Sequence, residues 1–360
     1  MQFGLSSEQT LLQDSIGSYL RERAPLDRVR RFADGGEGRA VDLMDGLANL
    51  GLPGLLIAEQ HGGVGLTPLD ACLAAEVLGR HVAPVAFTAS AVMVPTALRL
   101  AASPAQQAEW LPQIAAGRLN VGAAMSERSG ARAGTGVVSN NGRLNGRALH
   151  VIDFNADAYL VSDTVGQLHM LPADAPGLTR IPLETVDRTR PLGELVFDNA
   201  PAALLPGSDA TVCTQVLDIA RAVLAADTFG AAQAMLAQAV AYAGQRQQFG
   251  RVIGSFQAVK HLCADMAAAL EPCRAFVWYT GHALGEALPD AHLLACQLKA
   301  HLSDVGQQVA KSATEVHGGM GFTDLLGLHY WFKRIGANRQ LLGSPERLRF
   351  EAAQTQGLAA

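Results

Sequence analysis

The chain has 360 residues, of which 49% are hydrophobic and 17% are charged, and its formal net charge is -5. The charged share lies below the usual value of about 25%. We therefore expect part of the surface to be buried between subunits of an oligomer. The basic residues are scattered along the chain, which gives no support to nucleic-acid binding.

The five cysteines show no paired CxxC spacing, so the sequence predicts no metal site and suits a reducing compartment. The N-terminal segment has no apolar signal-peptide core. The longest uncharged stretch, Val82 to Leu98, contains two prolines and is shorter than the roughly 20 residues that a membrane span needs. We expect a cytoplasmic protein without a membrane partner, and a buried, proline-interrupted helix over this stretch.

In chain order, residues 1–117 show helical spacing of apolar residues, with a capping box at Ser6 and Gln9. Residues 118–208 change to short alternating runs, and Asn141-Gly142 and Asn145-Gly146 are turn signals. From 209 to 360 the chain returns to helices, which are predicted from near Thr211 to about Arg246, from Gln257 to Ala287 and from Ala291 to Val316. The pattern predicts an α+β protein with an N-terminal helical domain, a middle β-barrel or sandwich and a C-terminal helical domain.

Three segments resemble signatures of the acyl-CoA dehydrogenase family. Residues 246–257 (RQQFGRVIGSFQ) resemble R-x-x-F-G-x-x-I-x-x-F-Q, and residues 315–322 (EVHGGMGF) resemble Q-x-x-G-G-x-G-[FY]. Residues 124–127 (AMSE) are similar to the start of the T/S-E-P-G-A-G-S-D stretch of the β-domain. The order and spacing fit the family over essentially the whole chain. The resemblance implies the family fold, in which a four-helix bundle forms the C-terminal domain.

The resemblance also implies that FAD is bound at a subunit interface, in a homodimer or homotetramer or in a heterotetramer with a related subunit. A guanidinium at Arg246 suits a pyrophosphate, because it donates two parallel hydrogen bonds. Phe249 offers an apolar face to the adenine, and glycines let the backbone approach phosphates closely. The predicted adenine-side residues are Arg246, Phe249, Gln257, His317, Gly318, Gly319 and Gly321.

In the β-domain, Ser126 matches a hydroxyl residue that family members point at the flavin pyrimidine edge. His150 falls where an aromatic side chain often covers the flavin, so we predict both as flavin contacts; a buried structural histidine is the competing interpretation. Two departures stand out: SERSGARAG replaces the usual pattern, and Ile152 replaces a threonine whose hydroxyl meets flavin N5.

The family reaction removes the α-proton of an acyl-CoA with a carboxylate while the β-hydride moves to flavin N5. Electrons then pass to an electron-transfer flavoprotein or a similar acceptor. The two family positions for this base hold Leu342 and Ala220 here, and neither side chain takes a proton. Asp227 lies seven residues, or about two helical turns, beyond Ala220 on the same face. We predict Asp227 as the catalytic base, with Asp218 as a weaker candidate and a structural acid as the competing interpretation.

Three hypotheses follow from the resemblance. The first is an FAD-dependent dehydrogenase that desaturates an acyl-CoA thioester with Asp227 as base. The second is a non-catalytic FAD-binding subunit of a heteromeric acyl-CoA dehydrogenase. The third is a flavin monooxygenase or oxidase on the same scaffold, since such enzymes also lack the base.

Overall fold

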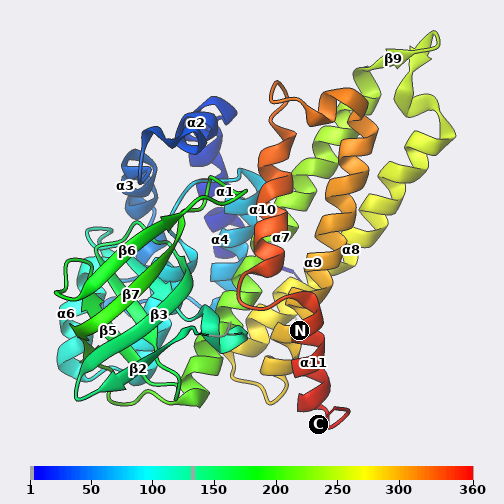
Figure 1. The fold of residues 1–360 in the computed structure, drawn as a ribbon. Helices are drawn as coiled ribbons and strands as arrows, with labels where there is room; N and C mark the ends of the chain where they lie inside the picture. The colour runs from blue at the N-terminus through cyan, green and yellow to red at the C-terminus, as the bar shows by residue number, and fades with distance from the viewer. Residues whose placement is uncertain (1–3, 131–133, 360) are drawn as a thin grey trace.

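A computed structural model describes residues 4–130 and 134–359 (Figure 1). A sheet lies on one side of a set of long helices, and the N-terminal helices pack beside both. The N-terminal region is helical, as predicted, and the capping box of Ser6 and Gln9 is confirmed. Its α-helices are α1 (Ser7–Arg23), α2 (Leu26–Arg31), α3 (Val41–Asn49), α4 (Pro68–Arg80), α5 (Val94–Ala101) and α6 (Pro104–Ala115), with short π- or 3-10-helical turns η1 (Phe32–Gly36), η2 (Leu52–Gly54), η3 (Glu59–His61) and η4 (Thr88–Met93).

The stretch from Val82 to Leu98 is buried, as predicted, but it is helical only in its second half. The chain leaves α4 at His81, and Val82 takes a positive φ of 45°. Helical structure resumes at η4 and continues directly through α5, so Pro95 lies inside a continuous helical segment, just after the π-helical turn. The predicted helix therefore begins only at residue 88, because residues 82–87, which include Pro84, form an irregular connection.

The middle region is an eight-stranded mixed sheet in the order β6-β7-β3-β1-β4-β5-β8, with β2 paired to β3. The pairing of β1 with β4 is parallel, and the other strand pairs are antiparallel. A short turn, η5 (Ser126–Ser129), follows the first strand. The strands are β1 (Val121–Ala124), β2 (Gly136–Asn140), β3 (Arg143–Ile152), β4 (Ala158–Ser162), β5 (Leu168–Pro172), β6 (Leu178–Leu183), β7 (Leu192–Pro201) and β8 (Ala203–Leu204).

The two Asn-Gly signals have different outcomes. Asn141 and Gly142 both have positive φ and connect β2 to β3, so this turn is confirmed. Asn145 and Gly146 lie inside β3, where the pairing with β7 shifts register. Gly146 has a φ of 117°, and a Cβ there would come within 2.2 Å of the Gly136 carbonyl oxygen. This second pair therefore marks a bulge and a close backbone approach rather than a turn.

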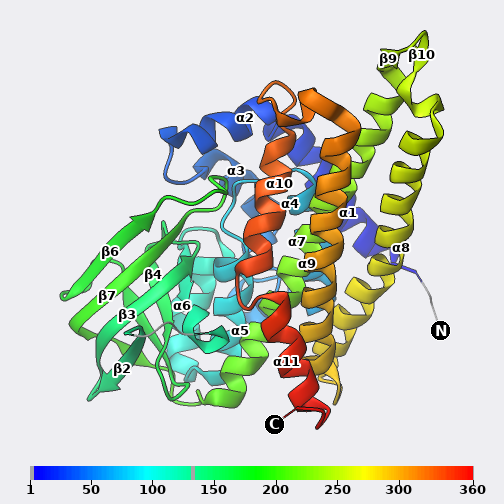
Figure 2. The same cartoon turned by 45° about the vertical axis from the view of Figure 1, so that its right-hand side comes forward.

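The C-terminal region is a helical bundle, and its predicted helices are confirmed to within two residues at each end. Figure 2 shows these helices side by side, with a small hairpin projecting from one end. Its helices are α7 (Ala210–Gln245), α8 (Gln257–Gly285), α9 (Ala291–His317), α10 (Leu328–Gln340) and α11 (Pro345–Thr355); the connections hold β9 (Gln247–Gln248), β10 (Arg251–Val252), η6 (Ile253–Ser255) and η7 (Gly318–Phe322). Among the described residues, α7 alone is long and apolar enough to cross a membrane. Of the apolar 18-residue segment of α7, 67% is buried, as in the core helix of a globular protein.

The helical regions at the two ends of the chain share one hydrophobic core, which includes residues of α1, α3 and α4 together with α7, α8 and α9. Helix α4 crosses α7 at two glycines. A Cβ on Gly79 would come within 2.0 Å of the Asp227 carbonyl oxygen, and one on Gly230 within 1.8 Å of the Glu76 carbonyl oxygen. The elements change type between Ala115 and Val121 and between Leu204 and Ala210. The division into three domains at 117 and 208 stays a prediction.

Candidate active site

A cavity of about 810 Å³ lies between the sheet and the C-terminal helices. Its volume is within the range of small-molecule and cofactor sites, about 300–1,000 Å³. The sheet side contributes η5, Leu149 and His150 of β3, and the loop at residues 185–187. The helical side contributes the part of α10 from Phe332 onward and the segment that leads into α11. Of the described residues, those that line this cavity include none from α7.

The two residues predicted to contact the flavin both line this cavity. The Ser126 hydroxyl donates to the backbone carbonyl of His150 at 3.0 Å, and His150 has a positive φ of 50°. The Leu149 amide donates to the Glu127 carboxylate, and burial raises the pKa of this carboxyl group. Hydrogen bonds therefore hold η5 against β3 and present Ser126 and His150 at one wall. Their contacts with a flavin stay predictions.

The two positions where the family carries its base meet at an apolar surface. Leu342 lines the cavity, and both Leu342 and Ala220 are buried members of one hydrophobic cluster. The neighbouring Arg221 donates from Nε to the Leu342 carbonyl oxygen at 3.1 Å, which ties α7 to this segment. This wall offers no carboxylate, so neither position provides a proton acceptor.

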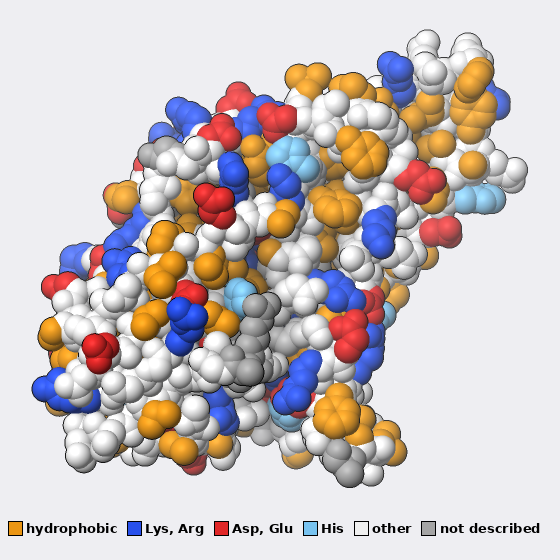
Figure 3. Space-filling model, in the orientation of Figure 1, with side chains coloured by type: hydrophobic (Ala, Val, Ile, Leu, Met, Phe, Trp, Pro, Cys, Tyr) orange, Lys and Arg blue, Asp and Glu red, His pale blue; other side chains and the backbone are white. Residues whose placement is uncertain are grey.

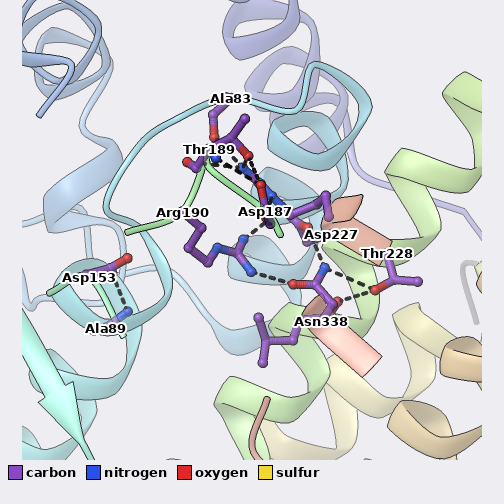
Figure 4. A network of polar contacts seen from close by, with 11 residues as sticks. Ala83, Ala89, Asp153, Asp187, Thr189, Arg190, Asp227, Thr228 and Asn338 are labelled. Carbon is purple, nitrogen blue, oxygen red and sulfur yellow. Dashed lines mark hydrogen bonds and ion pairs between the residues drawn. The ribbon is translucent and has the colours of Figure 1, made fainter. Parts of the chain in front are cut away.

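Asp227, the predicted base, lies outside the large cavity in a buried ionic network (Figure 4). Asp227 is only 3% exposed to solvent. One carboxylate oxygen accepts from Arg190 and from Arg334, each at 3.2 Å, and the other accepts from Asn338 at 2.6 Å. Two guanidinium groups and one amide therefore occupy the acceptor sites of this carboxylate. This placement favours a structural role for Asp227 over the predicted catalytic one.

The same network fixes one wall of the cavity. Arg334 of α10 donates from Nε to Asp187 at 2.8 Å, and Asp187 also accepts from the Thr189 amide at 2.9 Å. Asp187 lines the cavity, so the loop between β6 and β7 is anchored to the bundle through buried ion pairs. The geometry makes the loop a fixed part of the site.

The weaker candidate, Asp218, is also buried and paired. Its carboxylate accepts from Arg221 at 3.2 Å and contacts His292 Nδ1 at 2.8 Å, and this contact raises the pKa of His292. Asp218, His292 and Cys296 lie within metal-ligand reach of one another. The Arg221 guanidinium pairs with Glu351 and also contacts Cys296, so a cationic side chain already contacts two of the three members of this cluster.

The predicted adenine-side residues lie at the far end of the bundle (Figures 1 and 2). Arg246 follows the last residue of α7, Phe249 is 92% exposed at the tip of the β9–β10 hairpin, and Gln257 begins α8. Figure 3 shows hydrophobic side chains at this projecting end. An apolar tip of this kind, on a chain of low charge, suits contact with another subunit.

The glycine-rich segment is at the same end. His317 is buried, with its Nδ1 2.7 Å from the Ala313 carbonyl oxygen and its ring 4.7 Å from that of Tyr242. Gly318 has a φ of 57°, and added Cβ atoms on Gly318 and Gly319 would meet nothing within 4 Å. Gly321 packs closely instead, because its Cβ would lie 2.7 Å from the Thr314 carbonyl oxygen. The open backbone at Gly318 and Gly319 fits a phosphate approach.

The structure thus assembles the predicted residues in two groups and does not join them within one chain. Flavin-side residues line the cavity, whereas none of the adenine-side residues does. The cavity suits an isoalloxazine ring: Leu149, Leu192 and Leu342 supply apolar walls, and η5 supplies polar groups at one edge. The hairpin and the glycine-rich segment therefore lie apart from the chain's own cavity.

Sequence reasoning missed several residues of the cavity wall. Lys333 and Gln340 lie on α10, and Arg347 lies in the first turns of α11. Their sequence positions surround Leu342, which the family pattern had singled out. The position of Leu342 could have indicated these residues, because residues on either side of a site-forming turn commonly line the same site.

Comparison with known proteins agrees with this architecture. The N-terminal domain model of the acyl-CoA dehydrogenases matches residues 6–118, and the C-terminal domain model of the same family matches residues 210–355. FadE34 of Mycobacterium tuberculosis, an acyl-CoA dehydrogenase, is 31% identical over 98% of this chain, which spans 48% of the length of FadE34. IpdE2 of Mycolicibacterium smegmatis, also an acyl-CoA dehydrogenase, is 29% identical over 96% of this chain and 98% of its own length.

Among solved structures, a variant of the steroid acyl-CoA dehydrogenase Tcur3481-Tcur3483 has a TM-score of 0.88 and 29% identity, covering 97% of this chain and 98% of that one. The ChsE4-ChsE5 complex of Mycobacterium tuberculosis has a TM-score of 0.91 at 22% identity and covers both chains fully, which shows the shared fold. The chain belongs to the acyl-CoA dehydrogenase family of FAD-containing oxidoreductases.

Proposed function

We propose that this chain is an FAD-binding subunit of a heteromeric acyl-CoA dehydrogenase, in which a related partner subunit supplies the carboxylate that removes the α-proton. One observation carries the proposal: both base positions are apolar and buried in one hydrophobic cluster, with Leu342 at the cavity wall and Ala220 behind it, while Asp227 is held by two arginines outside the cavity. The assembly would oxidise an acyl-CoA thioester to its α,β-unsaturated form.

The separation of the two predicted FAD-binding groups supports an assembly of subunits. Arg246 and Phe249 lie on a hairpin that projects away from the chain's own cavity. In a pair of related subunits, this hairpin would reach the partner's cofactor. Two structural relatives are named as two-component proteins, Tcur3481-Tcur3483 and ChsE4-ChsE5, and this chain is similar to both over essentially its whole length.

FAD supplies the hydride acceptor when it is bound. This chain's residues would position it: η5 and His150 at one wall, the anchored loop at residues 185–187 at another, and Arg246 toward the pyrophosphate held with the partner. The buried leucines at 341 and 342 would exclude water from the ring. We further propose that an electron-transfer flavoprotein or a similar acceptor reoxidises the assembly and that it works in the cytoplasm.

The test compares the chain purified alone with the chain co-expressed with a second family member encoded beside it. The assay measures bound flavin and acyl-CoA-dependent dye reduction. We expect the co-expressed pair, but not the chain purified by itself, to reduce the dye when acyl-CoA is added. We also expect an Asp227→Asn variant of the pair to retain most of its activity per folded protein.

Two results would contradict the proposal. Acyl-CoA-dependent reduction by the chain alone, abolished by a folded Asp227→Asn variant, would establish Asp227 as the base. Oxygen consumption driven by NADH or NADPH, without reduction by acyl-CoA, would instead identify the monooxygenase or oxidase chemistry of this scaffold.

A further inference from the structure

One buried hydroxyl at the cavity has no hydrogen-bond partner. Ser129 is the last residue of η5, lines the cavity and is 7% exposed. Within the described part of the chain, its Oγ makes no hydrogen bond. Leaving a buried hydroxyl unpaired costs about 1–3 kcal/mol, and buried polar groups nearly always have a partner. The cavity beside this side chain is where such a partner would lie.

The rest of the turn is already paired. The Ser126 hydroxyl donates to the His150 carbonyl, and the Glu127 carboxylate accepts from the Leu149 amide. Both contacts join η5 to β3, and the Gly130 amide donates to the Glu127 carbonyl as the turn ends. The turn that carries Ser129 is therefore held against β3 while the buried Ser129 hydroxyl has no partner among the described residues. An unpaired hydroxyl on a residue that lines a cavity is the arrangement expected of a ligand contact rather than of an accidental packing gap.

The sequence around Ser129 points the same way. When Glu127 is aligned with the glutamate of the E-P-G-A-G-S-D pattern, Ser129 stands where that pattern has a glycine. The substitution adds a polar side chain to the cavity wall. Meanwhile Ile152, which replaces the pattern's threonine, is fully buried in the hydrophobic core and supplies no hydroxyl. The chain has thus lost one hydroxyl of the pattern, at Ile152, and gained another, at Ser129, which lines the cavity.

We propose that Ser129 is a flavin-contact residue, whose hydroxyl donates a hydrogen bond to an acceptor atom of the isoalloxazine ring or the ribityl chain. The inference rests on the FAD-binding part of the proposed function. A donor at the ring tunes the electronic properties of a flavin, and a donor at the ribityl chain orients it. Ser129 would then be both an affinity determinant and a spectroscopic marker of the site.

The test uses the full-length chain, in the assembly in which it purifies, with FAD and riboflavin as separate probes. Ser129→Ala should weaken binding of both probes about 5- to 10-fold, the effect of losing one hydrogen bond. It should also shift the visible absorption bands of bound flavin. Because the hydroxyl is unpaired without ligand, the flavin-free variant should unfold at the same temperature as the parent protein or a higher one.

Ser90→Ala is the matched control, because Ser90 is also buried, lies outside the cavity and has a paired hydroxyl that accepts from the Val121 amide at 3.1 Å. This control should lower the unfolding temperature and leave flavin affinity unchanged. Unchanged affinity and spectrum in Ser129→Ala would overturn the inference while leaving the proposed function intact. Weaker binding of FAD without weaker binding of riboflavin would also overturn it, because the contact would then be to the phosphates or adenosine. A parent protein that binds neither probe would overturn the inference and the flavin site together.

Discussion

Removing the Asp227 carboxylate tests whether this residue serves stability or chemistry. Asp227→Ala leaves the buried guanidinium of Arg190 without its ion-pair partner, whereas Arg334 keeps its pair with Asp187. Asn338 loses one of its two acceptors as well and keeps the Thr228 hydroxyl. Breaking one side of a buried ion pair costs about 3–5 kcal/mol, because the charge left behind is neither solvated nor paired. We expect a loss of that size in the free energy of unfolding.

The companion variant Asp227→Asn separates charge from hydrogen bonding. Its amide oxygen can still accept from one arginine, so we expect a smaller loss than for alanine. The surface control is Asp27→Ala, which removes the partner of Arg30 from a pair whose acid side chain is 86% exposed. Exposed pairs contribute at most about 1 kcal/mol.

Urea unfolding followed by circular dichroism measures all three variants against the parent protein. Equal denaturant slopes would show that the differences are changes in stability. The structural interpretation is refuted if Asp227→Ala stays within about 1 kcal/mol of the parent, as expected for the surface control. In that case Asp227 would carry little of the network, and its role as base would regain support.

Three further predictions concern packing and titration. Gly79→Ala should destabilise the protein by at least about 2 kcal/mol, because the added Cβ forces α4 away from α7. Gly244→Ala on α7, where an added Cβ meets open space, should stabilise the protein by up to about 1 kcal/mol. Thermal unfolding compares the two variants. Burial lowers the pKa of Lys299 to about 7, so the unfolded chain binds the additional proton and stability should rise between about pH 7 and pH 10.5; Lys299→Met should flatten this rise in unfolding curves taken across that range. The pKa of His292 is raised by Asp218, so its contribution is present below about pH 6.5 and is lost as the pH rises through the folded-state pKa; His292→Gln should remove this dependence.

Each of these predictions has an opposing result. Equal unfolding temperatures for the two glycine variants would show that the crossing of α4 and α7 relaxes without cost. A pH dependence that is unchanged in Lys299→Met would mean that the buried amine keeps its ordinary pKa. A His292→Gln variant that loses the same stability at pH 5 and pH 8 would assign the histidine a packing role only.

Much of the fold could be predicted from signals that are local in the sequence. The ends of α7, α8 and α9 follow from alanine-rich helical runs bounded by residues that break them, and these signals lie within a few residues of each boundary. The turn at Asn141-Gly142 was equally local. Asn145-Gly146 misled because a glycine in an irregular strand and a glycine in a turn have the same sequence pattern, and the register of β3 against β7 decides between them.

The site was less predictable because its decisive contacts are distant in sequence. Asp227 lies on the helix and face where a base was expected, but its partners Arg190 and Arg334 are 37 and 107 residues away. The sequence around Asp227 does not indicate that either arginine contacts it. The absence of a base at Leu342 and Ala220 was visible in the sequence, and the structure added that both side chains belong to one buried apolar cluster.

The close crossing of α4 and α7 also bears on how the chain is made. Synthesis runs from the N-terminus, so α4 leaves the ribosome well before Gly230, the residue that lets α7 approach it. Until about 150 further residues have followed, including the whole sheet, the face of α4 that packs on α7 has no partner, although α1 already contacts α4. The nascent N-terminal helices therefore expose apolar surface for the time needed to translate the β region. The order of the elements therefore makes this interval the stage of synthesis at which we expect the chain to be most prone to aggregation.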